Sequence, residues 1–219
     1  MSFVLPSLYP IVDADAAAAA GWTVADLTRA FADGGATLIQ LRAKRATARE
    51  WLQLAEAVLS AARPAGVRVL INDRTDIAAV AGADGVHLGQ DDLPPAMAAH
   101  LLGRGRVIGW SAHTEALIRQ ALDEPVDYVG VGPVYATGTK QTDYGDVGLE
   151  RVRAARRVLD AEALRTGRPR LPMVAIGGIT LDRAPAVVAA GADGVSVISD
   201  LLSAGDPSAR VRQYIARLR

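Results

Sequence analysis

The sequence predicts a single-domain (β/α)8 barrel, also called a TIM barrel, from three observations. Short apolar runs rich in Val and Ile alternate eight times with Ala- and Leu-rich stretches, and no linker or change of composition interrupts them. The runs are apolar at almost every position, which is typical of parallel strands buried on both faces. Eight such units in 219 residues match a compact barrel over residues 1–219. An open doubly wound sheet is the alternative, but no GxGxxG turn follows the first run.

The elements alternate regularly along the chain. Strands are predicted at 8–12, 37–42, 67–72, 85–89, 106–112, 128–134, 173–179 and 194–199. Helices are predicted at about 23–33, 48–62, 76–81, 94–102, 114–122, 149–164, 182–190 and 207–218. The repeated "AGADGV" at 81–86 and 190–195 fits a helix C-cap glycine followed by a tight turn. The alanine run at 16–20 is either loop or the start of a helix.

The composition excludes several classes of protein. Lys plus Arg and Asp plus Glu both number 24, so no net charge recruits nucleic acid or an anionic membrane. The absence of cysteine excludes disulfides, thiolate metal sites and a cysteine nucleophile. Neither a signal peptide nor an apolar stretch of about 18 residues is present. We therefore expect a soluble cytoplasmic protein, and the sequence leaves open whether it forms a homo-oligomer.

Polar residues interrupt the apolar runs mainly where the predicted strands end. In a (β/α)8 barrel these ends and the loops after them carry the functional residues. In strand order from the second to the eighth, the candidates are Gln40, Arg42 and Lys44; Asn72 and Asp73; His87, Gln90, Asp91 and Asp92; Ser111 and His113; Thr137, Thr139 and Lys140; Gly177 and Gly178; Ile198 and Ser199.

The second strand end suggests a site for a diphosphate. Gln40, Arg42 and Lys44 are spaced by two residues and would lie on one face of an extended segment. Two cations that point the same way repel each other unless an anion lies between them. Arginine offers a planar fork and lysine a point charge, and the two together suit a diphosphate. The alternative is a pair of solvated surface cations.

The third and fourth strand ends suggest a metal site. Asp73 and Asp92 follow neighbouring strands, so their carboxylates could converge beside the cations. Mg²⁺ often takes one or two carboxylates together with substrate phosphate oxygens. Alternatively, Asp73 pairs with Arg74 or caps the next helix, and Asp91 or Asp92 caps the helix that opens at Pro94.

The last three strand ends suggest a second anion site. Hydroxyls and an ammonium group, at Thr137, Thr139 and Lys140, follow the sixth strand. "IGGI" at 176–179 and "VISD" at 197–200 end the seventh and eighth strands, where backbone N–H groups bind phosphate in this fold. The alternative for the glycine segment is a tight turn with close packing.

The histidines are open to two readings. His87 is either a hydrogen-bonded residue of the barrel interior or a catalyst. His113 could touch a substrate, and Ser111 with His113 could form a nucleophile and base, but no acid is identifiable as an orienting partner.

These residues lie in blocks that resemble the thiamine-phosphate synthase family. The blocks are "QLRAK" (40–44), "INDRTDIAAVAGADGVHLGQDDLP" (71–94), "IGWSAHT" (108–114), "DYVGVGPVYATGTK" (127–140), "VAIGGI" (174–179) and "GADGVSVIS" (191–199). They occur in family order and span most of the chain, and "INDR…GVHLGQDD" is the most specific of them.

The resemblance implies a reaction and a set of residues. The family joins 4-amino-2-methyl-5-(diphosphooxymethyl)pyrimidine to 4-methyl-5-(2-phosphooxyethyl)thiazole, or its carboxylate, and releases pyrophosphate with Mg²⁺. The pyrimidine diphosphate would be held by Gln40, Leu41, Arg42, Ala43, Lys44, Asn72, Ser111 and Lys140. Within that set, catalysis would rest on Arg42, Lys44, Ser111 and Lys140. The thiazole phosphate would be held by Thr137, Gly138, Thr139, Gly178, Ile198 and Ser199, and Mg²⁺ by Asp73 and Asp92.

Three features depart from the family pattern. "QTDYGDVG" follows Lys140 where a lysine or an acid often comes sooner, and the connection at 159–172 is long and is expected on the stability face. Trp110 replaces a smaller residue and either packs under the pyrimidine pocket or fills the barrel. Two rivals remain, a thiazole tautomerase with a histidine near His113 and a non-catalytic phosphate-ligand sensor or regulator.

Overall fold

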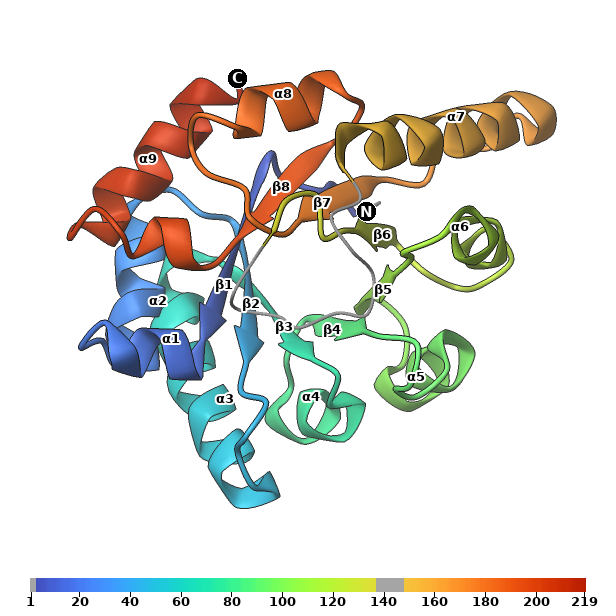
Figure 1. Cartoon of the computed structure of the whole chain (residues 1–219). Helices are drawn as coiled ribbons and strands as arrows, with labels where there is room; N and C mark the ends of the chain where they lie inside the picture. Colours follow the sequence, from blue (N-terminus) through green and yellow to red (C-terminus); the bar gives the residue numbers. More distant parts are fainter. Residues whose placement is uncertain (1–2, 137–147) are drawn as a thin grey trace.

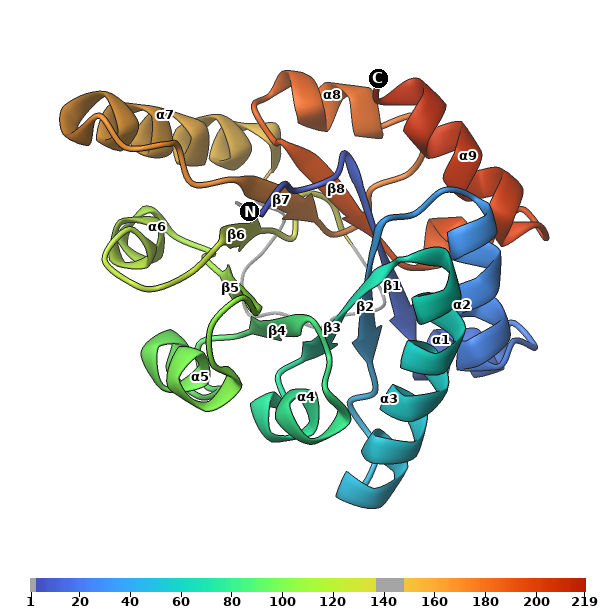
Figure 2. The ribbon, with the colours of Figure 1, turned by 180° about the vertical axis from the view of Figure 1, so that it is seen from behind.

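The protein folds as a closed parallel barrel, in a computed structural model that describes residues 3–136 and 148–219. The eight strands pair in chain order, from β1 next to β2 round to β8, which pairs with β1. Helices surround this ring on the outside, as views from the two ends show (Figure 1, Figure 2). The predicted (β/α)8 barrel is confirmed.

The strands begin close to their predicted positions, and some of them end earlier. They are β1 (Leu8–Asp13), β2 (Leu38–Arg42), β3 (Arg68–Asn72), β4 (Gly85–Leu88), β5 (Val107–Ser111), β6 (Tyr128–Val131), β7 (Met173–Ile176) and β8 (Gly194–Val197). The prediction carried β7 as far as residue 179. The strand stops at 176 because Gly177 and Gly178 have φ values of 104° and 58°, outside the region that strands use.

The helices also match, with additions. They are α1 (Ala14–Ala19), α2 (Val24–Asp33), α3 (Ala48–Ala62), α4 (Thr75–Ala81), α5 (Pro95–Leu102), α6 (Glu115–Ala121), α7 (Gly148–Thr166), α8 (Ala184–Ala189) and α9 (Pro207–Arg217), with the 3-10 turns η1 (Arg63–Ala65) and η2 (Ser199–Leu201). The alanine run is helical because the Asp13 carboxylate caps α1 by accepting the N–H of Ala16 at 2.9 Å. In the described part of the chain, no helix is long and apolar enough to cross a membrane.

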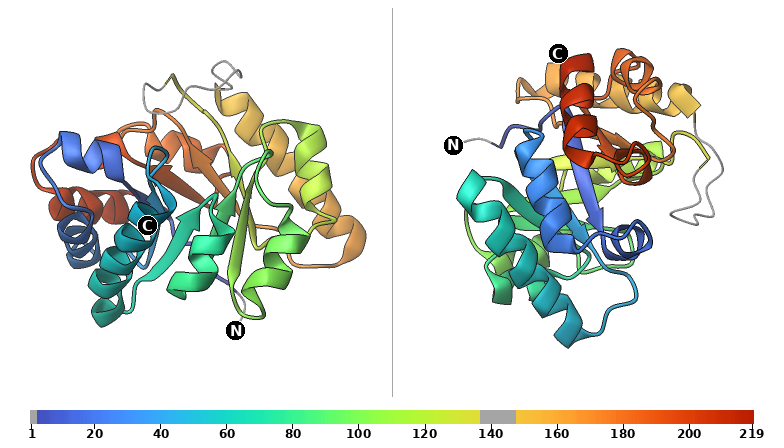
Figure 3. Two further views of the ribbon diagram at one scale, coloured as in Figure 1. Left: turned by 90° about the horizontal axis from the view of Figure 1, so that it is seen from below. Right: turned by 90° about the vertical axis from the view of Figure 1, so that its left-hand side faces the viewer.

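Two apolar layers hold the barrel together. The larger one fills the space between the strands and the surrounding helices. The smaller one lies inside the barrel and consists of Tyr9, Leu38, Leu70, Val107, Tyr128 and Val174, with Phe3 and Leu5 packed against it. This inner layer fills the amino end of the barrel. Figure 3 shows the barrel and its surrounding helices from two further sides. Space for a ligand therefore remains at the carboxyl ends of the strands.

An aspartate before alternate strands stabilises the amino end of the barrel. Its backbone N–H donates to a carbonyl of the preceding strand, and its carboxylate accepts the N–H of that same residue. The pairs are Asp84 with Val69, Asp127 with Ile108 and Asp193 with Met173. Two of these aspartates belong to the "AGADGV" repeats, in which Gly82 and Gly191 have φ values of 68° and 116°, so the predicted turns are confirmed.

The long connection at 159–172 also lies at this amino end. Its first half extends α7, which projects from the ring of helices (Figure 1). Arg170 then pairs with Asp193, directly before β8, and reaches Asp160 at 3.5 Å. The connection is thus placed on the stability face, as predicted.

Candidate functional site

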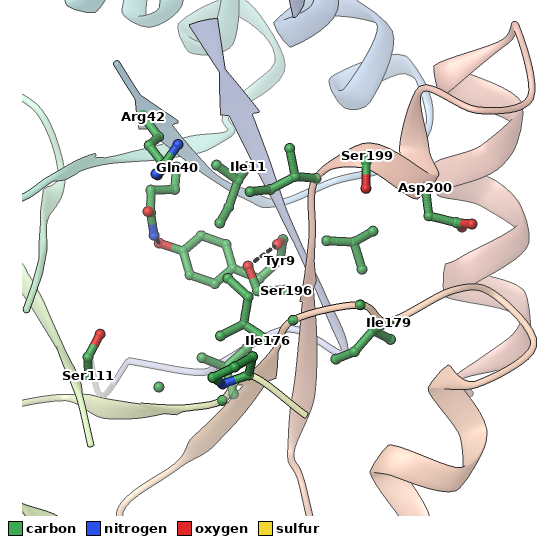
Figure 4. Close-up of a pocket in the computed structure, with 18 of the residues that line it drawn as sticks. Tyr9, Ile11, Gln40, Arg42, Ser111, Ile176, Ile179, Ser196, Ser199 and Asp200 are labelled. Carbon is green, nitrogen blue, oxygen red and sulfur yellow. Dashed lines mark hydrogen bonds between the residues drawn. The ribbon is translucent and has the colours of Figure 1, made fainter. Parts of the chain in front are cut away.

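A cavity of about 400 Å³ opens at the carboxyl ends of the strands. Side chains from opposite sides of the barrel point toward it, including Arg42 and Gln40 on one side and Ser199 on the other (Figure 4). Of the residues predicted from sequence, the walls contain Gln40, Arg42, Asn72, His87, Ser111, His113, Gly177, Gly178, Ile198 and Ser199. The structure therefore gathers in one place residues that lie far apart in the chain.

Arg42 is held by a carboxylate that the sequence prediction missed. Its guanidinium forms an ion pair with Asp13, which ends β1 and has only 3% of its surface exposed. Asp13 aligns with Arg42 in the β1–β2 register. Asp13 follows a buried strand at the same rim and precedes a helix, and that position was the signal that could have identified it.

Lys44 lies beyond the end of β2 and points to a different carboxylate. Its ammonium is 2.5 Å from Asp73, and about half of the lysine side chain is exposed. The two cations of "QLRAK" are therefore both paired with carboxylates. Each has its own acid, Asp13 for Arg42 and Asp73 for Lys44, so both are held at the rim before any ligand arrives.

Asp73 and Asp92 converge, as expected. Burial raises the pKa of Asp92, and the nearby Asp73 carboxyl raises it further, against a lowering contribution from the Gly89 N–H. That N–H donates to Asp92 at 2.6 Å. Asp73 does not pair with Arg74, which pairs with Asp76 instead. Neither Asp73 nor the two aspartates before Pro94 cap a helix, because α4 and α5 have no side-chain cap. Among the residues described, no group of three or more His, Cys, Asp or Glu side chains could hold a metal, so a metal here would need ligand oxygens as well.

The backbone of Asp73 adopts a strained conformation. Its φ is 63°, and it is the only non-glycine residue with a positive φ among the described residues. Its N–H still bonds to the His87 carbonyl of β4, and the chain then turns sharply, with Arg74 N–H bonded to Asn72 O at 2.7 Å. Backbone strain of this kind concentrates at functional sites, since it costs about 1–3 kcal/mol and must be offset elsewhere.

Polar groups line the floor of the cavity. Asn72 is buried, and its side-chain nitrogen has no hydrogen-bond partner among the described residues, so it is available to a ligand. The Ser111 hydroxyl lies 3.1 Å from Nε2 of His87. Nδ1 of His113 lies 2.7 Å from the Gly132 carbonyl oxygen. Ser111 therefore contacts His87 rather than His113, which corrects the pairing considered from sequence.

The opposite wall is built on glycine. A side chain at Gly177 would come within 2.5 Å of Pro133, and one at Gly178 within 2.4 Å of the Ala136 carbonyl oxygen. The loop after β7 therefore packs directly on the loop after β6. Ile198 and Ser199 lie next to it at the start of η2, whose first N–H groups have no partner within their own turn.

Two charged residues on this wall were missed by the sequence prediction. Arg183 lies 4.6 Å above the Tyr135 ring and donates to the Gly178 carbonyl at 3.0 Å, so a cation borders the glycine loop. Asp200 lies at the other edge, where Arg210 and the Tyr214 hydroxyl hold its carboxylate. Arg183 lies directly before α8 and away from any strand end, whereas Asp200 belongs to the "VISD" segment after β8 but was not chosen as a candidate.

Several predicted residues lie elsewhere. Leu41, Ala43 and Trp110 are buried in the layer between strands and helices. Leu41 and Ala43 could reach a ligand only through their backbone. Trp110 fills neither the pocket nor the barrel, because odd-numbered positions of β5 face inward, and its indole N–H donates to Gly89 O at 3.2 Å. Thr137, Gly138, Thr139 and Lys140 lie outside the described residues.

These features define the class to which the chain belongs, a (β/α)8-barrel protein whose cavity has a cationic rim on one side and a glycine-containing wall on the other. The comparisons give the family. The model of the thiamine monophosphate synthase family matches residues 8–201, so the chain belongs to that family. The thiamine-phosphate synthase of Moorella thermoacetica is 44% identical over 197 residues, 89% of each chain. That of Natronomonas pharaonis is 44% identical over 196 residues, 89% of this chain and 87% of the relative.

Solved structures agree with this assignment. The thiamine phosphate pyrophosphorylase of Pyrococcus furiosus superposes with a TM-score of 0.80 at 29% identity, covering 97% of this chain and 95% of that one. A 3-hexulose-6-phosphate synthase superposes with a TM-score of 0.68 at 19% identity, covering 97% of this chain and 100% of the other. The latter likeness is one of fold alone.

Proposed function

We propose that this chain is a thiamine-phosphate synthase. It would join 4-amino-2-methyl-5-(diphosphooxymethyl)pyrimidine to 4-methyl-5-(2-phosphooxyethyl)thiazole, or its carboxylate, and release pyrophosphate. The observation that carries the proposal is one cavity with Arg42 on one side, beside which Lys44 lies at the rim, and the glycine loop after β7 on the other. Two substrates that each bear a phosphate group need such a pair of sites.

The cationic wall would hold the diphosphate. Arg42 can offer its planar fork and Lys44 a point charge, and the unpartnered amide nitrogen of Asn72 can add a hydrogen bond. Lys140 would supply a further cation. Because Asp13 and Asp73 already hold the first two cations in position, little reorganisation is needed when negative charge grows on the departing pyrophosphate.

Asp73 and Asp92 would hold Mg²⁺. Their carboxylates are close enough that Asp73 raises the pKa of Asp92, a like-charge contact that a cation between them relieves. Two carboxylates and substrate phosphate oxygens are a common set for this ion. When bound, it neutralises charge on the pyrophosphate oxygens.

The glycine wall would hold the thiazole phosphate. The backbone N–H groups of Gly178, Ile198 and Ser199 would bind the phosphate, since Gly178 borders the cavity and the 3-10 turn η2 begins at Ser199. Thr137, Gly138 and Thr139 would complete the site from the loop after β6. This arrangement would direct the thiazole nitrogen toward the pyrimidine in the middle of the cavity.

The reaction would be dissociative. The bond between the pyrimidine methylene carbon and the diphosphate oxygen breaks, and its electron pair leaves with pyrophosphate. The methylene cation is stabilised by the amino-substituted ring until the thiazole nitrogen supplies the electron pair for the new bond. No nucleophile of the protein is needed, and Ser111 is not arranged as one, because His87 contacts Tyr128 at 2.9 Å where a triad would have a carboxylate.

The whole chain would act as one catalytic domain of residues 1–219 in the cytoplasm. Small-molecule substrates are its expected partners, and neither nucleic acid nor membrane is required.

The test is to mix the purified protein with both substrates and Mg²⁺ and to quantify pyrophosphate and thiamine phosphate together. We expect both products in a one-to-one ratio and no product without metal. Failure of folded protein to form thiamine phosphate contradicts the proposal. In that case, conversion of thiazole isomers that is lost in His113→Asn would indicate a tautomerase instead.

A further inference from the structure

An arginine without an acidic partner borders the glycine wall of the cavity. Arg183 lies directly before α8, is exposed and lines the cavity. Among the residues that the structure describes, no carboxylate forms an ion pair with it. Two other arginines that line or flank the cavity differ in this respect, because Arg42 pairs with Asp13 and Arg210 with Asp200. The charge of Arg183 is therefore available to a ligand.

Two neutral groups hold this guanidinium against the wall. Arg183 donates through Nη1 to the Gly178 carbonyl oxygen at 3.0 Å, and its guanidinium carbon lies 4.6 Å from the centre of the Tyr135 ring. The backbone N–H of Tyr135 donates to the Gly177 carbonyl at 3.0 Å, which fixes the base of that ring. The backbone N–H of Arg183 donates to the Thr180 carbonyl, also at 3.0 Å. The loops after β6 and β7 thus position the arginine without neutralising it.

The guanidinium keeps most of its hydrogen-bond donors. Arginine has five N–H groups in a planar fork, and Gly178 accepts from one of its nitrogens. A phosphate group can accept two parallel hydrogen bonds from such a fork. Arg183 therefore has donors as well as charge to offer an anion at the glycine wall.

The rest of this wall offers a phosphate little positive charge. Asp200 lies on the same side of the cavity as Ser199 (Figure 4), and Arg210 and the Tyr214 hydroxyl hold its carboxylate. The backbone N–H groups at this wall are neutral. Since a phosphate monoester carries about −1.5 to −2 charges at neutral pH, a nearby cation would strengthen its binding, and Arg183 is placed to supply it.

We propose that Arg183 is a substrate-binding residue that contacts the phosphate group of the thiazole phosphate, and that Tyr135 is a positioning residue that holds its guanidinium. This inference rests on the proposed function and adds a charged side chain to a site otherwise assigned to backbone N–H groups and hydroxyls. Each anionic substrate would then meet its own arginine, Arg42 for the diphosphate and Arg183 for the thiazole phosphate.

The first test is Arg183→Gln, which removes the charge. We expect KM for the thiazole phosphate to rise roughly tenfold, the effect of losing a hydrogen-bonded charged contact, and KM for the pyrimidine diphosphate to stay within about twofold of the wild type. A thiazole-phosphate KM that does not change, or an equal rise in both KM values, overturns the proposal.

Arg212→Gln is the matched control. Arg212 is also an exposed arginine that donates to a backbone carbonyl, that of Asp33 at 3.4 Å, but Asp33 ends α2 at the amino end of the barrel. Both KM values should stay within about twofold of the wild type. A rise in the thiazole-phosphate KM equal to that of Arg183→Gln would show that overall charge is responsible and would overturn the proposal.

Isothermal titration calorimetry with the thiazole phosphate gives a readout independent of turnover. Pyrophosphate and Mg²⁺ are included so that they occupy the cationic wall. We expect affinity to fall from the wild type to Arg183→Lys and further to Arg183→Gln, because lysine keeps the charge and loses the fork. Arg183→Lys that binds no more tightly than Arg183→Gln overturns the role of charge. Wild-type protein that shows this order but forms no thiamine phosphate defeats the proposed function and leaves the binding role of Arg183 established.

Tyr135 variants test the positioning role by the same titration. Tyr135→Leu removes the ring and should weaken binding roughly threefold, the effect of one cation–π contact, whereas Tyr135→Phe keeps the ring and should bind like the wild type. In an Arg183→Gln background, Tyr135→Leu should cost less than about 1.5-fold, because the contact is already lost. An equal loss in both backgrounds overturns the positioning role of Tyr135.

Discussion

The Arg42 guanidinium and the Asp13 carboxylate form an ion pair that joins the carboxyl ends of β2 and β1. Both side chains are largely buried, yet Arg42 also borders the cavity. Asp13 thus holds the guanidinium at the edge of the cavity, and an anion that binds there would share Arg42 with this carboxylate.

Asp13→Asn should make the free energy of unfolding depend more strongly on added pyrophosphate. Removing one partner of a buried pair destabilises a fold by about 3–5 kcal/mol, and the open cavity should keep the loss near the lower value. Pyrophosphate binds the unpaired Arg42 and should restore part of this loss. Urea unfolding with and without pyrophosphate measures both effects. A pyrophosphate shift no larger than that of the wild type contradicts the expected role of Arg42.

Lys44→Ala should reduce activity much more than stability. Loss of one charge that stabilises the transition state costs about 10²–10³-fold in rate, whereas a half-exposed ion pair contributes about 0.2–1 kcal/mol to stability. Steady-state kinetics and thermal unfolding should be measured on the same preparation.

Arg45→Ala is the matched control for Lys44. Arg45 is adjacent in sequence but is more exposed than Lys44, and it pairs at 3.1 Å with Asp15 rather than with Asp73. Its loss should leave kcat/KM within about twofold of the wild type, in keeping with the small contribution of exposed pairs. Equal losses in the two variants would show that general surface charge, rather than Lys44, matters.

Asp92→Asn should weaken the binding of Mg²⁺ without unfolding the protein. The amide oxygen can still accept the Gly89 N–H, and the unfavourable contact between two carboxylates disappears. We expect the Mg²⁺ concentration for half-maximal rate to rise at least about tenfold, the effect of one lost charged ligand, and metal-free stability to stay equal or increase. Asp91→Asn, at the exposed neighbouring position, should leave the Mg²⁺ dependence unchanged.

Gly178→Ala should impair the thiazole-phosphate site. The new methyl group would lie 2.4 Å from the Ala136 carbonyl oxygen, so the loops after β6 and β7 must separate. We expect KM for the thiazole phosphate to rise at least about tenfold, because small displacements of substrate-positioning groups have effects of this order. Gly21→Ala also places alanine at a positive φ, 77°, but meets no atom within 4 Å. This substitution should cost only about 1 kcal/mol of stability, and KM for the thiazole phosphate should equal that of the wild type.

Asp127, at the amino end of the barrel, should make a pH-dependent contribution to the free energy of unfolding. Burial raises its pKa above the ordinary carboxyl value, against the lowering by the Ile108 N–H. The folded state therefore binds the proton more tightly than the unfolded state, so this group adds stability as the pH falls through about 4 and loses it as the pH rises.

Asp127→Asn removes that titration and keeps an acceptor for the Ile108 N–H, while Asp127→Ala removes the bond as well. At neutral pH we expect Asn to match or exceed the wild type and Ala to lose roughly 1 kcal/mol. Urea unfolding between pH 4 and pH 7 checks the sign. A wild type that gains stability over Asn as the pH rises contradicts the assignment.

Much of the site could be predicted from position alone. Gln40, Arg42, Asn72, Ser111, Gly178, Ile198 and Ser199 all border the cavity, and each stands at or just after a strand end. That rule works because parallel strands deliver all their carboxyl ends to one rim. It fails for Arg183, which reaches the cavity from the start of α8, and for Trp110, whose neighbours in β5 face inward while it faces the helices.

The sequence by itself determined the barrel and its elements, because buried parallel strands and their helices are written as local patterns of apolar residues. It also placed the polar rim. The tertiary structure alone decided which rim groups meet: Asp13 with Arg42, Asp73 with Lys44, and Tyr9 with Tyr128, which are 119 residues apart. Such pairings depend on strand register and on the direction of each side chain inside the closed barrel, and neither is a property of a short stretch of sequence.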